Sequence, residues 1–222
     1  MLYLFFCKYT LVVCEIEVFD FETINKAGVT RPLSLAFSNG NKWEYAEILD
    51  QTYENAALVV VNNFKNGCYY YAHNLIFDFL QLLPGLLSLN VRFTWVFIDY
   101  ELYGVKIFYK NKTINLRCSF KLIPYPLERF FPLLTNRPKL FFPYSTLSNW
   151  DSRVKCTEFE QIDQAYSGLA LGEYLKIYAT NDVKILKEGL LNFFLNLKEI
   201  GISFNKNLFS CGGIALKYYL SR

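Results

Sequence analysis

Residues 68–79 read CYYYAHNLIFDF, and the order of residues in this stretch decides the fold. Aromatic and small apolar residues at 68–72 predict a buried strand. A helix is predicted to begin at Leu75 or Ile76, with Asn74 near its N-cap. This helix carries Asp78 in an otherwise apolar run, where a carboxylate costs free energy unless a cation or hydrogen bonds compensate it.

Strands are expected on both sides of this unit. Residues 9–20 are rich in β-branched and aromatic types, and their alternation places Asp20 at a strand end. Residues 32–38 and 42–48 predict two more strands joined by a hairpin turn, so the chain is expected to start with three antiparallel strands. Two or three further strands are expected within 91–118.

Helical patterning accounts for most of the remaining chain. One helix is predicted over 50–65, and another over about 161–200. Five prolines punctuate 119–150, so short helices and loops are expected there. With 222 residues and a hydrophobic share of 53%, the chain predicts one α/β domain with its own core.

Asp20 and Glu22 form a D-x-E pair in the first predicted strand. Because side chains alternate with period two along a strand, both carboxylates lie on one face. There they repel each other unless a cation lies between them. Asp99-Tyr100-Glu101 has the same form, and we assign it no role. The pair alone therefore does not identify a site.

Tyr178 and Asp182 are four residues apart, so a helix places them next to each other on one face. A phenol there can hold an attacking water beside a metal-bound carboxylate. The alternative is a core tyrosine beside a solvated aspartate. Together with Asp20, Glu22 and Asp78, this pair suits a site where oxygen ligands hold two hard cations for phosphodiester cleavage.

Positive charge is concentrated in the second half of the chain. Residues 106–155 contain ten Lys or Arg against two Asp or Glu, although the net charge of the whole chain is only +3. Aromatic residues are interleaved with these cations. Positive charge follows a phosphate backbone and aromatic rings accept stacked bases, so the stretch predicts nucleic-acid binding. The alternative is a solvated basic face over ordinary core aromatics.

Other site and location classes find little support in the sequence. The six cysteines include no C-x-x-C pair and His73 is the only histidine, which argues against a zinc site. His73 is interpreted as a local structural residue. No apolar run is long enough to cross a bilayer, and residues 1–13 lack the features of a secretory signal. No membrane partner is expected.

The three acidic strings resemble the exonuclease motifs of family B DNA polymerases. These motifs are D-x-E, N-x-x-F-D and Y-x-x-x-D, and they match 20–22, 74–78 and 178–182. AHNLIFDF is similar to the protein-primed branch found in phages and linear mitochondrial plasmids, and a tyrosine in the third motif is the DEDDy pattern. SFKLIP at 119–124 and KLFFPY at 139–144 resemble two further elements of this branch, although phenylalanine replaces the usual leucine at 120.

The resemblance implies a fold and an activity. The fold is a ribonuclease-H-like (DnaQ-like) α/β fold with a mixed sheet of about five strands flanked by helices, in residues 1–205. Residues 206–222 are expected to be a truncated lead-in to a polymerase region. The activity is proofreading 3′–5′ exonucleolysis of a primer's single-stranded DNA 3′ end during replication, with two Mg²⁺, for which Mn²⁺ can substitute. No polymerase palm motif is present in the chain.

The resemblance also implies residue roles. Asp20 is expected to bridge the two metals. Glu22 and Asp182 are expected to hold the first metal, and Asp78 to support the second through water. Tyr178 is expected to orient the nucleophile. The other candidates are a catalytic helper, Lys139, and five DNA-binding residues, Asn74, Phe77, Ser119, Phe120 and Tyr144.

Two alternatives stay open. In the first, the chain is a catalytically silent polymerase fragment that only binds single-stranded DNA. In the second, it is a split subunit that needs a separate polymerase palm. A terminal protein is a further expected partner of the protein-primed branch. The abundance of Phe, Tyr, Asn, Lys, Leu and Ile, which is typical of AT-rich coding sequence, joins the resemblance in predicting a mitochondrial location.

Overall fold

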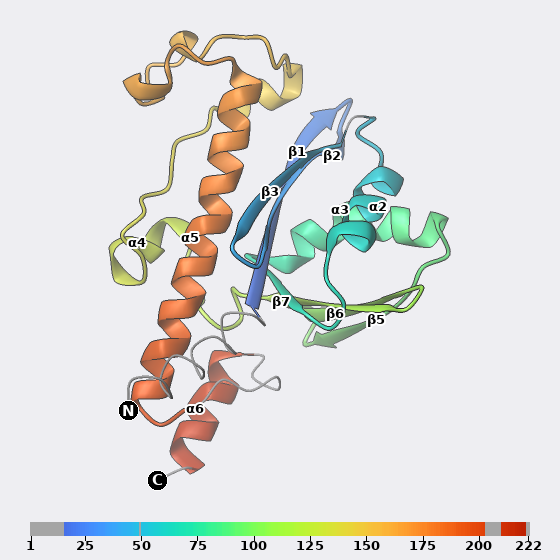
Figure 1. The fold of residues 1–222 in the computed structure, drawn as a ribbon, viewed down its shortest axis with the longest axis vertical. Helices are drawn as coiled ribbons and strands as arrows, with labels where there is room; N and C mark the ends of the chain where they lie inside the picture. Colours follow the sequence, from blue (N-terminus) through green and yellow to red (C-terminus); the bar gives the residue numbers. More distant parts are fainter. Residues whose placement is uncertain (1–15, 49, 203–209, 221–222) are drawn as a thin grey trace.

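The fold has three layers, with a sheet between two sets of helices (Figure 1). The structure is a computed structural model and describes residues 16–48, 50–202 and 210–220. Seven strands form one mixed sheet in the order β3-β2-β1-β4-β7-β6-β5. The helices α2 and α3 cover one face of the sheet, and the long helix α5 covers the β1–β3 end of the other face.

The sheet combines two antiparallel sets of strands with a parallel centre. The strands are β1 (Ile16–Lys26), β2 (Val29–Asn39), β3 (Lys42–Glu47), β4 (Tyr69–Ala72), β5 (Arg92–Ile98), β6 (Glu101–Tyr109) and β7 (Lys112–Cys118). As predicted, β1 to β3 are antiparallel, and 91–118 contributes three strands. β4 pairs in parallel with β1 and β7.

Two expectations about the strands need correction. The sheet has seven strands where about five were expected, because every predicted strand joins the same sheet. Asp20 lies within β1 instead of at its end, since β1 continues to Lys26 before turning into β2. Of the strand predicted at 9–20, residues 9–15 lie outside the described residues.

The helices also differ in extent from the expected ones. They are α2 (Tyr53–Asn63), α3 (Leu75–Ser88), α4 (Phe130–Leu133), α5 (Leu171–Glu199) and α6 (Cys211–Leu220), with short 3-10 turns between 127 and 166. α5 begins about ten residues later than predicted, because Asp163 caps a separate 3-10 turn. Glu173 then accepts a hydrogen bond from the backbone N–H of Ala170 and stabilises the start of α5.

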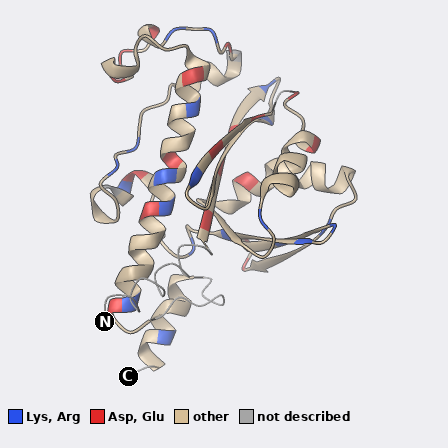
Figure 2. Ribbon diagram, in the orientation of Figure 1, with Lys and Arg blue, Asp and Glu red and all other residues tan. Residues whose placement is uncertain are grey.

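The chain turns sharply from β4 into α3 at Asn74. This residue has φ 69°, in the left-handed region that asparagine tolerates better than most residues, and it is the N-cap residue without a side-chain capping bond. The turn buries Leu75 and Phe79 against the sheet. It also places Asp78, the only charged residue of α3 (Figure 2), in the first helical turn and 1% exposed.

Three apolar clusters hold the layers together. One fills the space between the sheet and α2 and α3, and includes Phe19 and Phe79. A second joins α5 to the opposite face of the sheet through Val18 and Val183, among others. A third packs the first turns of α5 against the loops around Phe142. Burial of each large apolar side chain contributes roughly 1.5–3 kcal/mol to the free energy of unfolding. Because two of the clusters include residues of α5, the helix is held along most of its length.

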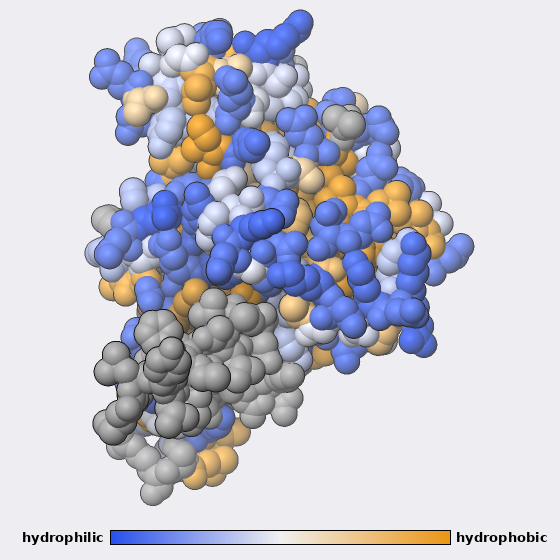
Figure 3. Space-filling view, viewed as in Figure 1, coloured by the Kyte–Doolittle hydropathy of each residue, from blue (hydrophilic) through white to orange (hydrophobic). Residues whose placement is uncertain are grey.

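Some apolar surface remains uncovered. Figure 3 shows it beside α2 and α3, among hydrophilic side chains that cover most of the visible face. At the edge of the sheet, β5 exposes successive apolar side chains, including Trp95, Val96 and Phe97. No helix in the described part of the chain is long and apolar enough to span a membrane.

Gly85 brings α3 into backbone contact with α2. A Cβ atom at this position would lie 2.0 Å from the backbone oxygen of Tyr53. Gly85→Ala is therefore expected to lower the free energy of unfolding by about 1–3 kcal/mol despite the better helix propensity of alanine. Urea unfolding measures this. Gly168→Ala is the matched control, because nothing lies within 4 Å of its Cβ position, and an equal loss in both variants would contradict the packing argument.

Candidate active site

Three carboxylates from two distant segments meet between β1 and the middle part of α5. β1 presents Asp20 and Glu22 on the same face, as period two requires, and α5 presents Asp182. One oxygen of each carboxylate lies within 4.8 Å of the others. A register shift between β1 and β2 follows directly after Glu22, and such irregularities re-aim strand side chains.

Asp78 approaches the same part of β1 from α3. Its Oδ1 accepts a hydrogen bond of 2.9 Å from the backbone N–H of Phe21, the residue between the two acids of β1. Its Oδ2 is buried and has no hydrogen-bond partner among the described residues. Asp78 is not part of the three-carboxylate cluster. The backbone of β1, which carries Asp20 and Glu22, holds it beside the cluster.

Lys139 compensates part of this negative charge. Its Nζ lies 2.9 Å from Oδ2 of Asp182. Burial lowers the pKa of Lys139, but the charge and hydrogen bond of Asp182, together with smaller effects of Tyr144 and Asp20, raise it to about 12, so the side chain is protonated at neutral pH. Asn181 of α5 donates a hydrogen bond of 3.0 Å to the backbone oxygen of Pro138. This bond ties the loop that contains Lys139 to the helix.

Two tyrosines form a hydrogen-bonded pair at the edge of the cluster. The hydroxyl of Tyr178 contacts the hydroxyl of Tyr144, and Tyr178 is fully buried one turn before Asp182. Burial raises the pKa of Tyr144 to about 12, and burial together with the charge of Asp182 raises the pKa of Tyr178 further. Both phenols are therefore neutral and able to donate a hydrogen bond.

The carboxylates perturb one another. Burial, followed by repulsion from Asp182, raises the pKa of Asp20 to about 7. Burial is also the main reason why the pKa values of Glu22 and Asp78 lie well above their usual range, with repulsion from Asp20 next. Burial raises the pKa of Asp182, although Lys139 opposes this. The site thus favours either protons or cations.

These groups line a pocket of about 300 Å³. Its walls contain acidic, basic, aromatic and aliphatic side chains: Asp20, Phe21, Glu22, Thr23, His73, Phe77, Leu127, Lys139, Tyr144, Leu147 and Asp182. The structure therefore brings together seven candidates from the sequence at one pocket or its wall, counting Tyr178 through its bond to Tyr144. Asp78 is linked to the pocket through Phe21.

Three of the predicted DNA-binding residues do not line this pocket. Asn74 is exposed at the turn before α3. Ser119 is fully buried and hydrogen-bonded to the backbone oxygen of Ala72 and to Nδ1 of His73. Phe120 is half-buried and packs edge-on against the His73 ring. Ser119 and Phe120 thus support a pocket residue.

His73 was missed as a pocket residue. The sequence suggested a local structural role, and its contacts with Ser119 and Phe130 agree with that. Yet His73 also lines the pocket. Burial lowers its pKa to about 4, so the ring is neutral at pH 7. Its position directly before the N-x-x-F-D string is the signal that could have identified it. Thr23, Leu127 and Leu147 carried no comparable signal.

The basic stretch at 106–155 divides into two groups. Some of its cations make structural contacts: Lys112 donates to the last carbonyl groups of α2, and Arg137 pairs with Glu188 of α5. Others are exposed, such as Lys106, Arg129 and Lys155. The prediction of a basic surface therefore applies to part of the stretch only.

The donor set fits hard divalent cations. All the candidate ligands are carboxylate oxygens, which suit Mg²⁺ or Mn²⁺ and not a soft metal. Besides Oδ2 of Asp78, Oδ1 of Asp182 is buried without a hydrogen-bond partner in the described residues. Buried carboxylate oxygens without partners are costly, and a cation in the pocket would satisfy them.

Comparison with known proteins gives a match in structure but not in sequence. The sequence matches no family model and no curated protein. Phi29 DNA polymerase complexed with single-stranded DNA superposes with a TM-score of 0.62 at 17% identity, over 91% of this chain and 34% of that one. The orthorhombic crystal form gives 0.61 at 20% identity, over 91% and 33%. The complex with primer-template DNA and incoming nucleotides gives 0.57 at 16% identity, over 93% and 34%.

This likeness confirms the fold predicted from the acidic strings. The chain has the ribonuclease-H-like α/β fold, with more strands than expected. It spans about a third of the length of the polymerase chains it matches. At these identities the likeness establishes the architecture, while the chemistry depends on the residues in the pocket.

The raised pKa of Asp20 predicts a stability that depends on pH. In the absence of metal, the stability contributed by protonated Asp20 is complete below its ordinary pKa of 3.8 and is lost as pH rises through about 7. The loss is at most about 4 kcal/mol. Urea unfolding in EDTA is expected to show Asp20→Asn gaining stability relative to the parent between pH 5 and 8. The titration of His73 contributes equally to both proteins and cancels in the difference between them. A difference in the free energy of unfolding that does not change with pH would contradict the prediction.

Proposed function

We propose that this chain is the 3′–5′ exonuclease part of a family B, protein-primed DNA polymerase, removing nucleotides from single-stranded DNA 3′ ends with two divalent cations. One observation carries the proposal: Asp20, Glu22 and Asp182 converge within 4.8 Å in a pocket that also contains Lys139. The fold shared with phi29 DNA polymerase supports it.

The proposed reaction gives each of these groups a task. Asp20, Glu22 and Asp182 would hold one cation. Asp78, fixed by the N–H of Phe21, would support a second. When bound, two such cations stabilise the attacking and leaving oxygens of an in-line displacement at phosphorus. Mg²⁺ is the proposed ion, and Mn²⁺ is expected to substitute.

The remaining side chains would orient the reacting groups and neutralise part of their charge. Lys139 donates to Asp182, which keeps that carboxylate aimed at the cluster, and its charge offsets part of the negative charge of a bound phosphate. The neutral hydroxyl of Tyr178, held by Tyr144, would orient the attacking water. Phe77, which is 42% exposed at the pocket wall, would stack on a terminal base.

Partners beyond the primer end are also part of the proposal. Exposed aromatic rings at Tyr125, Phe141 and Tyr144 lie within the basic stretch and suit an extended single strand. A polymerase palm, encoded separately or on a longer chain, and a terminal protein would be the other partners. The proposed location is the mitochondrion, in keeping with a linear plasmid.

Trimming of labelled single-stranded DNA tests the proposal. With Mg²⁺ or Mn²⁺, the protein is expected to shorten a 5′-labelled strand from its 3′ end. Asp20→Asn and Asp78→Asn are each expected to slow this by about a hundredfold or more, because each removes charge that acts in the transition state. Asp99→Asn, in the exposed turn between β5 and β6, is the matched control and is expected to trim like the parent.

Two results would count against this function. Equal trimming by the parent and both site variants would mean that a different nuclease is responsible. Salt-dependent binding of single-stranded DNA without trimming at any metal concentration would favour the alternative of a catalytically silent fragment.

Tyr178→Phe tests the role of the phenol separately from metal binding. The variant is expected to trim about a hundredfold more slowly, because the nucleophile loses its orientation, with unchanged affinity for Mn²⁺. Tyr174→Phe is the matched control: Tyr174 is equally buried one turn earlier in α5, and its hydroxyl donates to the backbone oxygen of Phe141. A similar loss of rate in both variants would indicate a packing effect.

A further inference from the structure

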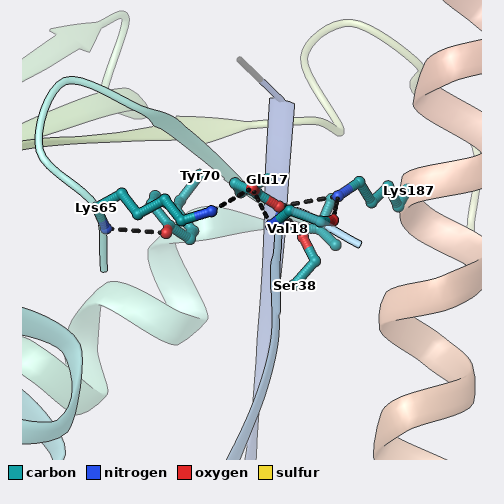
Figure 4. A network of polar contacts seen from close by, with 7 residues as sticks. Glu17, Val18, Ser38, Lys65, Tyr70 and Lys187 are labelled. Carbon is teal, nitrogen blue, oxygen red and sulfur yellow. Dashed lines mark hydrogen bonds and ion pairs between the residues drawn. The ribbon is translucent and has the colours of Figure 1, made fainter. Parts of the chain in front are cut away.

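A second charged cluster lies at the start of β1, outside the pocket (Figure 4). Glu17 is completely buried, and its carboxylate accepts hydrogen bonds from the hydroxyl of Ser38 at 2.5 Å and from the N–H of Gly40 at 2.6 Å. Lys187 of α5 donates to the same carboxylate at 2.9 Å. Lys65, which follows α2, lies 3.7 Å away on the other side.

Lys187 is as thoroughly engaged as Glu17. It is 5% exposed, and its Nζ also donates to the backbone oxygen of Gly40 at 2.8 Å, in the turn between β2 and β3. The Trp43 ring lies over it at 5.6 Å. The ion pair therefore ties α5 to both the first strand and the adjacent hairpin.

This ion pair joins the same two elements that form the carboxylate cluster. Along β1, Glu17 precedes Asp20 by three residues, about 10 Å. Along α5, Lys187 follows Asp182 by five residues, about 7.5 Å. The two contacts therefore link α5 to β1 at two different heights, so the first constrains the height at which the second occurs.

The electrostatic interaction between α5 and β1 is repulsive at the carboxylate cluster and attractive at the ion pair. At the cluster, carboxylate oxygens of Asp182, Asp20 and Glu22 lie within 4.8 Å of one another, and like charges at that distance oppose the contact between α5 and β1. The apolar contacts between α5 and the sheet, such as Val18 with Val183, resist separation but are not directional. A hydrogen-bonded ion pair is directional, and it favours the helix position in which Lys187 reaches both Glu17 and the backbone oxygen of Gly40.

We propose that Glu17 and Lys187 are positioning residues, which hold α5 in register on β1 so that Asp182 meets Asp20 and Glu22 and the cation site exists before the cation binds. The inference rests on the proposed function in that it takes the cluster as a divalent-cation site. A buried ion pair often adds little to stability compared with apolar or neutral replacements, and the setting of register is the role best established for such pairs.

Mn²⁺ binding and urea unfolding, measured on the same variants, test this role. Lys187→Met combined with Glu17→Gln removes both charges and leaves no unpaired ion. This double variant is expected to fold, and its Mn²⁺ affinity is expected to fall about tenfold or more, the usual cost of losing a group that orients a ligand. Lys187→Arg keeps the charge and is expected to restore the affinity to near the parent value.

Two controls separate positioning from stability. Lys65→Met removes the other cation beside Glu17, on the opposite side of Glu17 from α5 (Figure 4), and is expected to leave Mn²⁺ affinity unchanged. Leu190→Ala opens a cavity on the buried face of α5 and is expected to lower the urea concentration at the midpoint of unfolding, with Mn²⁺ affinity of the folded protein unchanged.

The outcomes distinguish this inference from the proposed function. Parent-like Mn²⁺ affinity in the double variant overturns the inference, and the function stands if Asp182→Asn still abolishes binding. A loss of Mn²⁺ affinity in Lys65→Met equal to that in the double variant overturns it too. A parent protein that binds no Mn²⁺ overturns both. If the double variant does not fold, Lys187→Gln alone decides: a Mn²⁺ affinity about tenfold lower in the folded protein supports the inference, and an affinity near the parent value overturns it.

Discussion

Repulsion among buried carboxylates is the constraint on which the rest of the structure depends. Asp20, Glu22 and Asp182 lie within 4.8 Å of one another, and Asp78 is held beside them. Such an arrangement is unfavourable without protons or cations, and it persists only where the surrounding elements fix each carboxylate. The fold supplies this fixation from three sides: a central strand, a helix start and the face of a long helix.

Each fixation uses a different physical device. The backbone of β1 itself holds Asp78, through the N–H of Phe21. Lys139 neutralises Asp182 directly, at 2.9 Å. The 29 residues of α5 are held by apolar contacts on the sheet and by the buried ion pair of Lys187 with Glu17. These contacts hold the carboxylate cluster in place without a bound ion, which suits the divalent-cation site proposed above.

Much of the site was predictable because its residues follow local periods. Alternation along a strand placed Asp20 and Glu22 on one face, and the spacing of four placed Tyr178 next to Asp182. The pocket role of His73 and the burial of Ser119 were not predictable, since both depend on how β4, β7 and the following loop meet. The segment at Asp99 shows the limit of prediction from local patterns. It has the same D-x-E pattern as the first motif, but Asp99 lies in an exposed turn.

The sequence by itself determined the strand–helix unit around Asp78 and the three antiparallel strands at the start, which follow from periodicity and turn residues that act over a few residues. The ribonuclease-H-like class was implied by the resemblance of the acidic strings to known motifs. Only the tertiary structure decided the seven-strand order, the pairing of Lys139 with Asp182 and that of Glu17 with Lys187. Glu17 and Lys187 are 170 residues apart, and contacts of that range arise from the packing of whole elements, which no local pattern encodes.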